Sequence, residues 1–243
     1  MKKIYVIGLG PGGRDQMTGR VLEAIEECEV ITGYKVYVEL IEELIKGKEV
    51  YVSGMTQEVD RCRKAMEYAL EGKTTAVVCS GDSGVYGMAG IVCEVCEDHS
   101  EIEIEVVPGI SACLSGAAVL GAPLIHDFAV ISLSDLLTPW EKIEKRLLLA
   151  SEADFVICLY NPSSRKRADY LKKACELMMR HKDQKTPCGY VKNIGREGEE
   201  GTICTLEELS DTQVDMFTTV FVGNSQTKII NGKMVTPRGY KGV

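Results

Sequence analysis

The sequence predicts an α/β protein made of two α/β domains, the first on a mostly parallel sheet and the second on a mixed sheet. Short runs rich in Val, Ile and Ala alternate with amphipathic helical segments along the chain. Several of these runs break abruptly into glycine-rich loops, as buried parallel strands do where a helix follows. With 243 residues, 45% of them hydrophobic, the chain can bury one large core or two smaller ones.

The first half of the chain alternates between strands and helices. Apolar runs that end in glycine loops predict strands at 3–7, 30–32, 49–52, 75–78 and 102–107. Apolar residues at helical spacing predict helices at 18–28, 36–46, 58–71, 85–96 and 112–120. Gly121-Ala122-Pro123 then interrupts the pattern. We therefore expect a domain boundary there, with one domain over 1–121 and the other over 122–243.

The pattern restarts after this break and becomes richer in short strands. We expect helices at 140–150 and 165–180. The expected strands are 128–133, 155–160, 187–192, 202–205, 216–222 and 228–235, with a turn at Asn231-Gly232 before the last. Successive short strands are typical of antiparallel pairing, so the second domain is expected to have a mixed sheet.

Composition argues against several classes of function. The formal net charge of -8 and the pI of about 5.1 argue against duplex nucleic acid as a partner, because such binding needs a basic surface. No apolar run reaches the length of a signal-peptide core or a membrane span, so we expect a cytoplasmic protein without membrane contact. The ten cysteines are scattered and are expected to be reduced core residues. Cys93 and Cys96 form a single CxxC, which predicts core packing rather than a metal site.

The loop that follows the apolar run 75–78 is the one around which the chain is organised. Gly81-Asp82-Ser83-Gly84 ends a buried strand and opens a helix, so its small residues let a ligand approach the backbone. Asp82 either orients a polar group of that ligand or caps the helix. A second small-residue loop, 108–112, ends the next strand. Two such loops on one sheet can border a common site.

A third glycine loop, 8–13, follows the first strand and looks like a dinucleotide fingerprint. Pro11 lies inside its turn, and the GxGxxG spacing is satisfied only loosely. A nicotinamide enzyme would also want an acidic residue near the end of the second strand to hold ribose, where Gly33-Tyr34-Lys35 stand instead. The sequence therefore argues against a nicotinamide oxidoreductase and favours another use of this loop.

These loops, in their order along the chain, resemble those of the tetrapyrrole methylases. The matching segments are 8–12, 80–86 and 107–112. Other segments resemble the precorrin-3B C17-methyltransferases of cobalamin biosynthesis more narrowly: 54–55, 84–90, 126–140, 160–162 and 222–227. The resemblance covers essentially the whole chain. Ser83 departs from the wider superfamily, in which proline is common after the Gly-Asp pair, and leaves Asp82 in place.

The resemblance implies two α/β domains with S-adenosylmethionine folded into the cleft between them. It implies methylation of C17 of precorrin-3B, or of its cobalt form, with ring contraction to (cobalt-)precorrin-4 and S-adenosylhomocysteine as product. The sulfonium methyl is already activated, so alignment and exclusion of water are needed rather than a nucleophilic residue. The positions that map to cofactor contacts are Pro11, Gly81, Asp82, Val85, Ser111, Ala112, Tyr160, Asn161 and Asn193.

The implied substrate carries acetate and propionate arms, which an acidic protein must meet with local positive charge. Basic residues expected to bind these arms are Arg165, Lys166 and Arg167, followed by Arg196 and Arg238. Residues that could assist ring contraction are His126, Asp127, Ser132 and Asp135, with a structural role for His126 and helix capping by Asp135 as the alternatives.

Alternatives within and beyond this family stay open. A corrin methyltransferase acting at C11 or C20 would share the glycine loops. A non-catalytic tetrapyrrole-binding protein would bind the macrocycle without affinity for S-adenosylmethionine, and the intact loops speak against it. The resemblance also suggests a homodimer. The residues are compatible with a substrate that carries cobalt and with one that does not.

Overall fold

The computed structural model describes residues 2–164 and 168–242 and divides the chain into two compact units, Met1–Ala112 and Cys113–Val243. The sequence pattern placed the boundary later, at Gly121. The helix that precedes Gly121, α5 (Ala112–Leu120), packs on the sheet of the second unit, because a Cβ at Gly116 would lie 2.9 Å from Ile194 and Phe221 side-chain atoms. The break at Gly121 thus marks the end of this helix.

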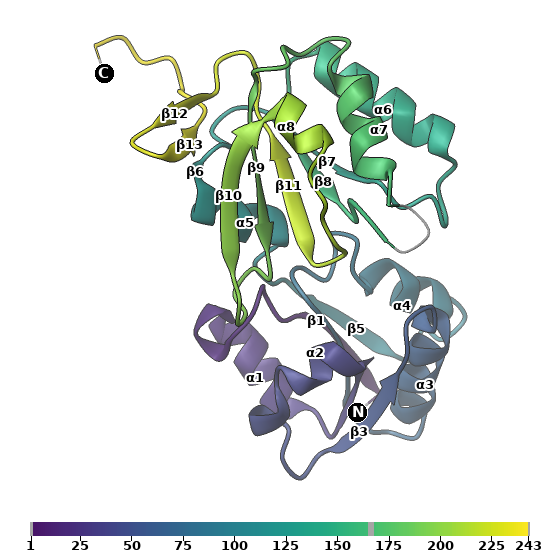
Figure 1. Ribbon diagram of the computed structural model, residues 1–243. Helices are drawn as coiled ribbons and strands as arrows, with labels where there is room; N and C mark the ends of the chain where they lie inside the picture. The colour runs from purple at the N-terminus through teal and green to yellow at the C-terminus, as the bar shows by residue number, and fades with distance from the viewer. Residues whose placement is uncertain (1, 165–167, 243) are drawn as a thin grey trace. The chain divides into compact units, whose positions relative to one another are not determined.

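The first unit is built on a five-stranded sheet whose paired strands all run parallel (Figure 1). Its strands are β1 (Lys3–Gly8), β2 (Val30–Tyr34), β3 (Glu49–Ser53), β4 (Thr75–Cys79) and β5 (Glu103–Val107). They lie in the order β3-β2-β4-β1-β5. The apolar runs are almost continuous because both faces of the central strands are covered.

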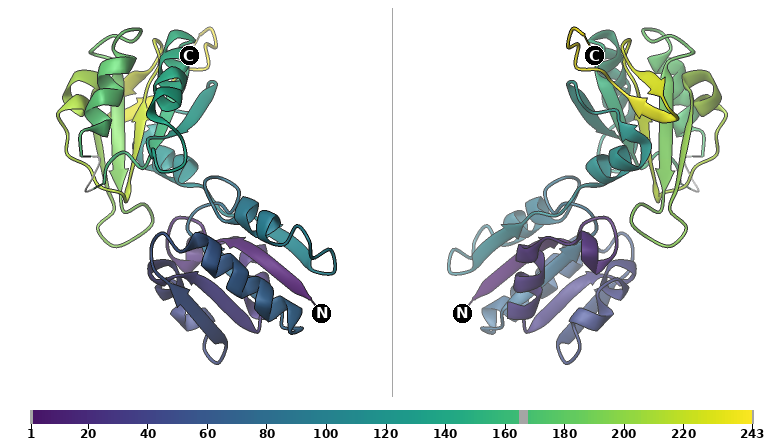
Figure 2. Two further views of the ribbon diagram at one scale, coloured as in Figure 1. Left: turned by 90° about the vertical axis from the view of Figure 1, so that its right-hand side faces the viewer. Right: turned by 90° about the vertical axis from the view of Figure 1, so that its left-hand side faces the viewer.

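Helices cover both faces of this sheet (Figure 2). The helices are α1 (Gly19–Glu27), α2 (Lys35–Glu39), α3 (Glu58–Leu70) and α4 (Ala89–Val95). Tyr5 and Ile7 of β1 belong to the core beneath α1 and α2, whereas Ile4 and Val6 belong to the core beneath α3 and α4. This alternation follows from the two-residue period of a strand.

The strand order creates a switch point between β1 and β4. The chain passes from β1 across β4 to β2, toward one edge of the sheet. From β4 it passes across β1 to β5, toward the other edge. Loops that leave neighbouring strands in opposite directions mark the place where open parallel sheets bind ligands, outside the carboxyl ends of the strands. The loops at this point are 9–13 and 80–88.

The second unit has a mixed five-stranded sheet, as expected. Its strands are β7 (Phe128–Ser132), β8 (Val156–Tyr160), β9 (Pro187–Lys192), β10 (Glu200–Thr205) and β11 (Thr218–Val222), in the order β10-β9-β11-β8-β7. Only β7 and β8 pair in parallel. The helices α6 (Trp140–Glu152), α7 (Tyr170–Met178) and α8 (Leu206–Ser210) share a core with Val220 and Val222, while Phe221 faces α5. Helices therefore cover both faces of this sheet.

A small third sheet joins β6 (Gly121–Ala122) to the hairpin of β12 (Lys228–Ile230) and β13 (Lys233–Val235). Asn231 and Gly232 both have positive φ, as the expected two-residue turn requires. No helix in the described part of the chain is long and apolar enough to cross a membrane.

Several helices differ from the expected ranges. The segment expected as helix 36–46 contains α2 and a separate 3₁₀ turn, Glu42–Leu44, and α8 was not expected. The helix expected at 85–96 begins only at Ala89, because residues 80–88 form an extended loop. The helix expected at 165–180 is α7, and residues 165–167 lie outside the described chain.

Candidate functional site

Three loops of the first unit meet backbone to backbone at the carboxyl edge of its sheet. Gly10 and Gly81 form an isolated two-residue bridge, with N–H···O distances of 3.0 and 2.7 Å. A Cβ on Gly109, after β5, would lie 2.2 Å from the Gly8 carbonyl oxygen and 2.3 Å from that of Gly81. Side chains are therefore excluded at Gly8 and Gly109, and Gly10 and Gly81 have positive φ values of 77° and 68°, so glycine is favoured in all three loops for one reason or the other.

Asp82 holds this junction together. Its Oδ1 accepts hydrogen bonds from the backbone N–H groups of Gly84 at 2.8 Å and Val85 at 3.0 Å. Its Oδ2 accepts from the N–H of Gly109 at 3.1 Å. Oδ1 thus holds the turn of the loop after β4, and Oδ2 joins this loop to the loop after β5. This geometry favours a structural role for Asp82 over direct contact with a ligand.

Around the junction, the loops present apolar side chains to solvent. Met55, Val85, Tyr86 and Ile110 follow β3, β4 and β5 and are all exposed, Tyr86 to 57%. Tyr86 also has a positive φ of 53°, which is uncommon for a bulky residue and fixes its position relative to the Asp82 turn. Exposed apolar groups over a polar backbone junction suit a ligand that combines a flat ring with hydrogen-bonding groups.

The other predicted residues of this unit lie in the same loops. Pro11 is buried in the loop after β1, and Ser111 is buried in the loop after β5. Ala112 is partly buried and begins α5. A Cβ on Gly81 would approach the backbone of these last two residues at 3.9 and 3.7 Å. The structure therefore brings Pro11, Gly81, Asp82, Val85, Ser111 and Ala112 to one edge of the first sheet.

The second unit has its own group of predicted residues at the carboxyl ends of β7, β8 and β9. Ser132 ends β7, and its Oγ accepts a hydrogen bond from Nδ2 of Asn161 at 2.9 Å. Asn161 and Asn193 follow β8 and β9 and have φ values of 53° and 49°. Because β8 and β9 both pair antiparallel with β11, they run in the same direction and their ends share one edge.

Tyr160 ends β8 and supports the start of α5. Its hydroxyl accepts a hydrogen bond from the backbone N–H of Cys113 at 2.8 Å. The first N–H groups of a helix have no partner within the helix, so this bond satisfies a group that would otherwise need water or a ligand. The structure assigns Tyr160 a positioning role that spacing along the chain does not reveal.

His126 and Asp127 lie apart from the other catalytic candidates. They precede β7, whereas Ser132 ends it, so the length of the strand, about 16 Å, separates them. The carbonyl of Asp127 accepts from the N–H of Val156 at the start of β8. His126 is partly buried, and its Nε2 is buried without a hydrogen-bond partner among the described residues. The geometry thus favours the structural alternative for His126.

Asp135 anchors the loop between β7 and α6. Its Oδ2 accepts a hydrogen bond from the Tyr170 hydroxyl at 2.6 Å, and the rings of Tyr170 and Trp140 lie 4.5 Å apart. Trp140 packs against the core of the second unit. Beyond this anchor, Leu136 and Leu137 extend into solvent, with Leu137 exposed to 97%. The loop therefore has a fixed base and an apolar tip.

The basic candidates are only partly described. Arg165, Lys166 and Arg167 lie outside the described residues. Arg196 is half-buried, with its guanidinium carbon 6.0 Å from the ring centroid of Phe217. Arg238 is exposed, close to the end of the described chain.

The cysteines are mostly buried, as expected, but Cys93 is exposed. Cys93 lies on the exposed side of α4, whereas Cys96, which follows the helix, is buried. Burial raises the pKa of the Cys62 and Cys175 thiols to about 12 and that of Cys79 to about 11. These thiols are therefore protonated and unreactive at neutral pH.

The segment 222–227 forms a structural junction at the opposite end of the second sheet. Lys182 donates from Nζ to the carbonyl oxygens of Phe155 at 2.9 Å and Gly223 at 3.0 Å. Asn224 Oδ1 accepts from the N–H of Gln226 at 3.0 Å. Burial lowers the pKa of Lys182. Gly223 adjoins the amino end of β8, so this motif is remote from Asn161.

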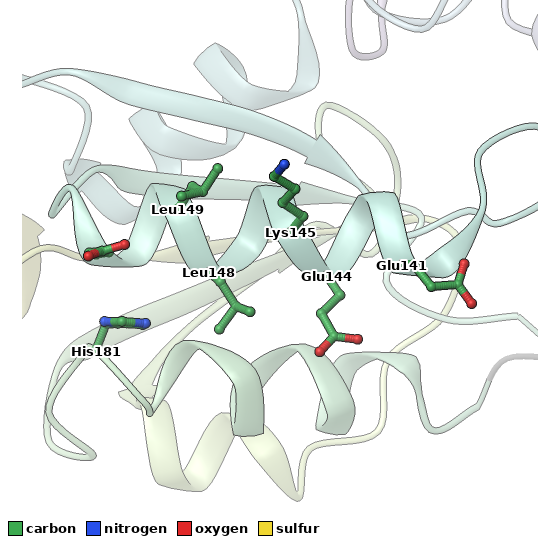
Figure 3. A pocket seen from close by; sticks show the side chains of 7 residues that line it. Glu141, Glu144, Lys145, Leu148, Leu149 and His181 are labelled. Carbon is green, nitrogen blue, oxygen red and sulfur yellow. The ribbon is translucent and has the colours of Figure 1, made fainter.

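A shallow pocket of about 580 Å³ lies on the outer surface of α6 (Figure 3). It is lined by Glu141, Glu144, Lys145, Leu148, Leu149, Glu152 and His181. None of these residues belongs to the loops at the carboxyl edges of either sheet. Its acidic lining is also opposite to what a carboxylate-bearing substrate needs. The loops are therefore a better candidate site than this pocket.

Sequence reasoning missed two features of these edges. Arg61 of α3 is a buried arginine beside the loops after β3 and β4. The sequence feature that could have revealed its burial is its helical spacing from Ala65 and Ala69, which are both buried. The exposed pair Leu136-Leu137 was visible only as two apolar residues in an expected loop.

Comparisons with known proteins agree with these observations. A family model of the tetrapyrrole (corrin/porphyrin) methylases matches residues 3–210. A probable cobalt-factor III C(17)-methyltransferase of Salmonella typhimurium is 47% identical, covering 98% of this chain and 99% of that protein. A precorrin-3B C(17)-methyltransferase of Sinorhizobium sp is 38% identical, covering 98% and 97%. The crystal structure of the methyltransferase CobJ matches with a TM-score of 0.90 at 36% identity, covering 96% of this chain and 99% of that chain. The resemblance predicted from the motifs is thus confirmed, and the chain belongs to the tetrapyrrole (corrin/porphyrin) methylases.

Proposed function

We propose that this protein transfers the methyl group of S-adenosylmethionine to C17 of a precorrin-3B-type tetrapyrrole, in its cobalt-bound or cobalt-free form, with ring contraction. The names of relatives that match over nearly their whole length support this reaction. The observation that carries the proposal is the junction of Gly10, Gly81 and Gly109 at the switch point of a parallel sheet, held by Asp82.

The residues at this junction fit S-adenosylmethionine. When bound, this cofactor supplies a methyl group that is already activated for displacement, so the protein needs to align and shield it. The glycine loops let a ligand approach the backbone, and Asp82 fixes the loop after β4 against that after β5. The exposed Val85, Tyr86 and Ile110 offer apolar contact for the adenine ring.

The carboxyl edge of the second sheet offers polar groups of a different kind. Ser132 and Asn161 are hydrogen-bonded to each other, so their hydroxyl and amide are held in fixed positions. We assign Asn161 and Asn193 to ligand contact because each follows a strand at the shared edge and has a left-handed backbone, which asparagine adopts readily and which forms the turn there. Tyr160 supports this edge through Cys113.

The macrocycle of the substrate needs an apolar contact as well as cations for its arms. The loop tip Leu136-Leu137 is proposed to supply it, because its base is fixed by Asp135 and Tyr170 while both leucines are exposed. A large exposed apolar pair on a soluble protein marks an interaction site when it is held in place.

The deciding experiment is anaerobic incubation of the protein with cobalt-factor III or precorrin-3B and methyl-labelled S-adenosylmethionine. Label at C17 of a ring-contracted product is expected. Label at C11 or C20 would indicate another corrin methyltransferase. Binding of the tetrapyrrole without any affinity for S-adenosylhomocysteine would indicate a non-catalytic carrier.

We further propose a cytoplasmic homodimer, on the family resemblance. Sedimentation equilibrium tests the association. A strict monomer of 26.7 kDa at micromolar concentration would refute the dimer.

A further inference from the structure

Arg61 is a buried cation at the carboxyl edge of the first sheet. It stands in the first turns of α3, on the stripe that continues through Ala65 and Ala69, and its side chain points into the unit with 3% of the residue exposed. The helical period thus places the charged guanidinium of Arg61 on a buried stripe whose other positions are occupied by small alanine side chains.

Within the described part of the chain, the groups that contact this guanidinium are neutral. Nε donates to Ser53 Oγ at 2.8 Å, and Nη2 donates to the Gly54 carbonyl oxygen at 3.0 Å. Nη1 lies 4.0 Å from the Met88 sulfur, and the Tyr34 ring centroid is 6.0 Å from the guanidinium carbon. Within residues 2–164 and 168–242, no ion pair includes Arg61.

A buried charge without a counterion costs free energy, and arginine cannot lose its proton to avoid that cost. Arginine also presents five N–H donors in a planar fork that matches a carboxylate. Ser53 and Gly54 take up two of its nitrogens, whereas Nη1 has only a thioether at long distance. The group is therefore short of an anionic acceptor on that side.

The elements around Arg61 lead to the loops of the candidate site. Ser53 ends β3 and Gly54 follows it, Tyr34 ends β2, and Met88 ends the loop that contains Asp82. Met55, the next residue of the β3 loop, is exposed. A ligand at this edge would approach Arg61 from the side of the loops.

We propose that Arg61 recognises a carboxylate of a ligand, a role that rests on the proposed function. Two sources share this chemistry. One is an acetate or propionate arm of the tetrapyrrole, and the other is the amino-acid carboxylate of S-adenosylmethionine. An incoming carboxylate would take up Nη1 and supply the counterion that the folded chain lacks.

The test compares Arg61→Met with Arg63→Met. Arg63 stands on the exposed side of the same helix and loses the same charge, so it is the matched control. Thermal melting measures stability, and calorimetry measures affinity for S-adenosylhomocysteine and for methylthioadenosine, which lacks the carboxylate. Absorbance titration measures tetrapyrrole affinity without requiring turnover, so a failure of catalysis does not obscure the result.

Arg61→Met is expected to melt at or above the wild-type temperature, because an apolar side chain replaces an uncompensated charge. Its affinity for one carboxylate ligand should fall by about tenfold or more. A loss for S-adenosylhomocysteine but not for methylthioadenosine identifies the cofactor carboxylate, and a loss for the tetrapyrrole alone identifies an arm. Arg63→Met should behave as wild type.

Arg61→Lys keeps the charge but not the fork, and it should retain part of the affinity. It also provides a readout if Arg61→Met does not fold. Lower melting temperature with wild-type affinities for all three ligands, in either variant, would show that Arg61 only supports the Ser53-Gly54 turn and would overturn the proposal.

Discussion

Replacing Gly109 by alanine tests the three-loop junction directly. The new Cβ would lie 2.2 Å from the Gly8 carbonyl oxygen and 2.3 Å from that of Gly81, whereas real Cβ contacts essentially never fall below 3.0 Å. The neighbours are backbone atoms, so no side chain can rotate away. One loop must move by about 0.8 Å or more for the variant to fold.

Two estimates of the stability that Gly109→Ala would lose agree. Overpacking of a tight interior costs about 1–3 kcal/mol, and the upper end applies where backbone must shift. Moving the loops would also strain the paired Gly10–Gly81 bonds and the bond from Gly109 N–H to Asp82, each with a net value of about 1 kcal/mol. We therefore expect Gly109→Ala to lower the free energy of unfolding by about 3 kcal/mol. A domain with about 5–15 kcal/mol of stability survives such a loss.

The assay combines urea denaturation with calorimetric titration of S-adenosylhomocysteine. Gly90→Ala is the control, because Gly90 lies in α4 and a Cβ there would meet nothing within 4 Å. The control should keep its affinity and gain up to about 1 kcal/mol of stability. If Gly109→Ala matches wild type in both urea midpoint and affinity, the inferred junction is wrong.

Three further variants test separate features. Tyr160→Phe removes the acceptor for the Cys113 N–H and should cost about 1 kcal/mol of stability together with some affinity for S-adenosylhomocysteine; unchanged values in both assays would contradict its assignment. Leu137→Ser should leave stability within about 0.5 kcal/mol of wild type while raising KM for the tetrapyrrole alone, and Leu149→Ser on α6 should change neither. Hydrogen bonds from Lys3 and Arg20 lower the pKa of Glu105 below its usual 4.5, so its stabilising effect is present above that pH and is lost as pH falls through the lowered pKa. Between about pH 6 and pH 3, the wild type should therefore lose more stability than Glu105→Gln, and equal losses would disprove the linkage.

The strands of both sheets could be predicted because their apolar runs are unambiguous. Residues 75–78 and 3–7 read as buried parallel strands, and both faces of β4 and β1 are covered. Helix starts were harder to predict. Val85, Tyr86 and Met88 are compatible with a helix, yet a hydrogen bond from Val85 to Asp82 and the tight packing of Gly87 on Ser83 hold this segment in a loop. Tertiary contacts thus override local propensity there.

The candidate site could be predicted as a set of loops but not as a set of contacts. The family resemblance brought Tyr160 and Asn161 into the prediction. The bonds from Cys113 N–H to the Tyr160 hydroxyl and from Asn161 to Ser132 depend instead on which strand ends share an edge. His126 and Ser132 are close in sequence but lie at opposite ends of the sheet. The reason is that β7 begins two residues after His126 and ends at Ser132.

Asp82 shows how a motif can be identified from the sequence while two roles for its carboxylate stay open. A lone carboxylate in a glycine loop suggests a group aimed at a ligand, but three backbone N–H groups already donate to its two oxygens. A carboxylate satisfied in this way holds the loop in one conformation, and the loop in turn presents its backbone to the ligand. The requirement for aspartate is then geometric, since glutamate would place the oxygens one methylene further from Gly84 and Gly109. Asp82→Asn should retain the bonds to one oxygen and lose that from Gly109, because an amide NH₂ cannot accept a hydrogen bond. We expect partial loss of S-adenosylhomocysteine affinity in Asp82→Asn and a larger loss in Asp82→Ala, and calorimetry would contradict this order if both variants lost affinity equally.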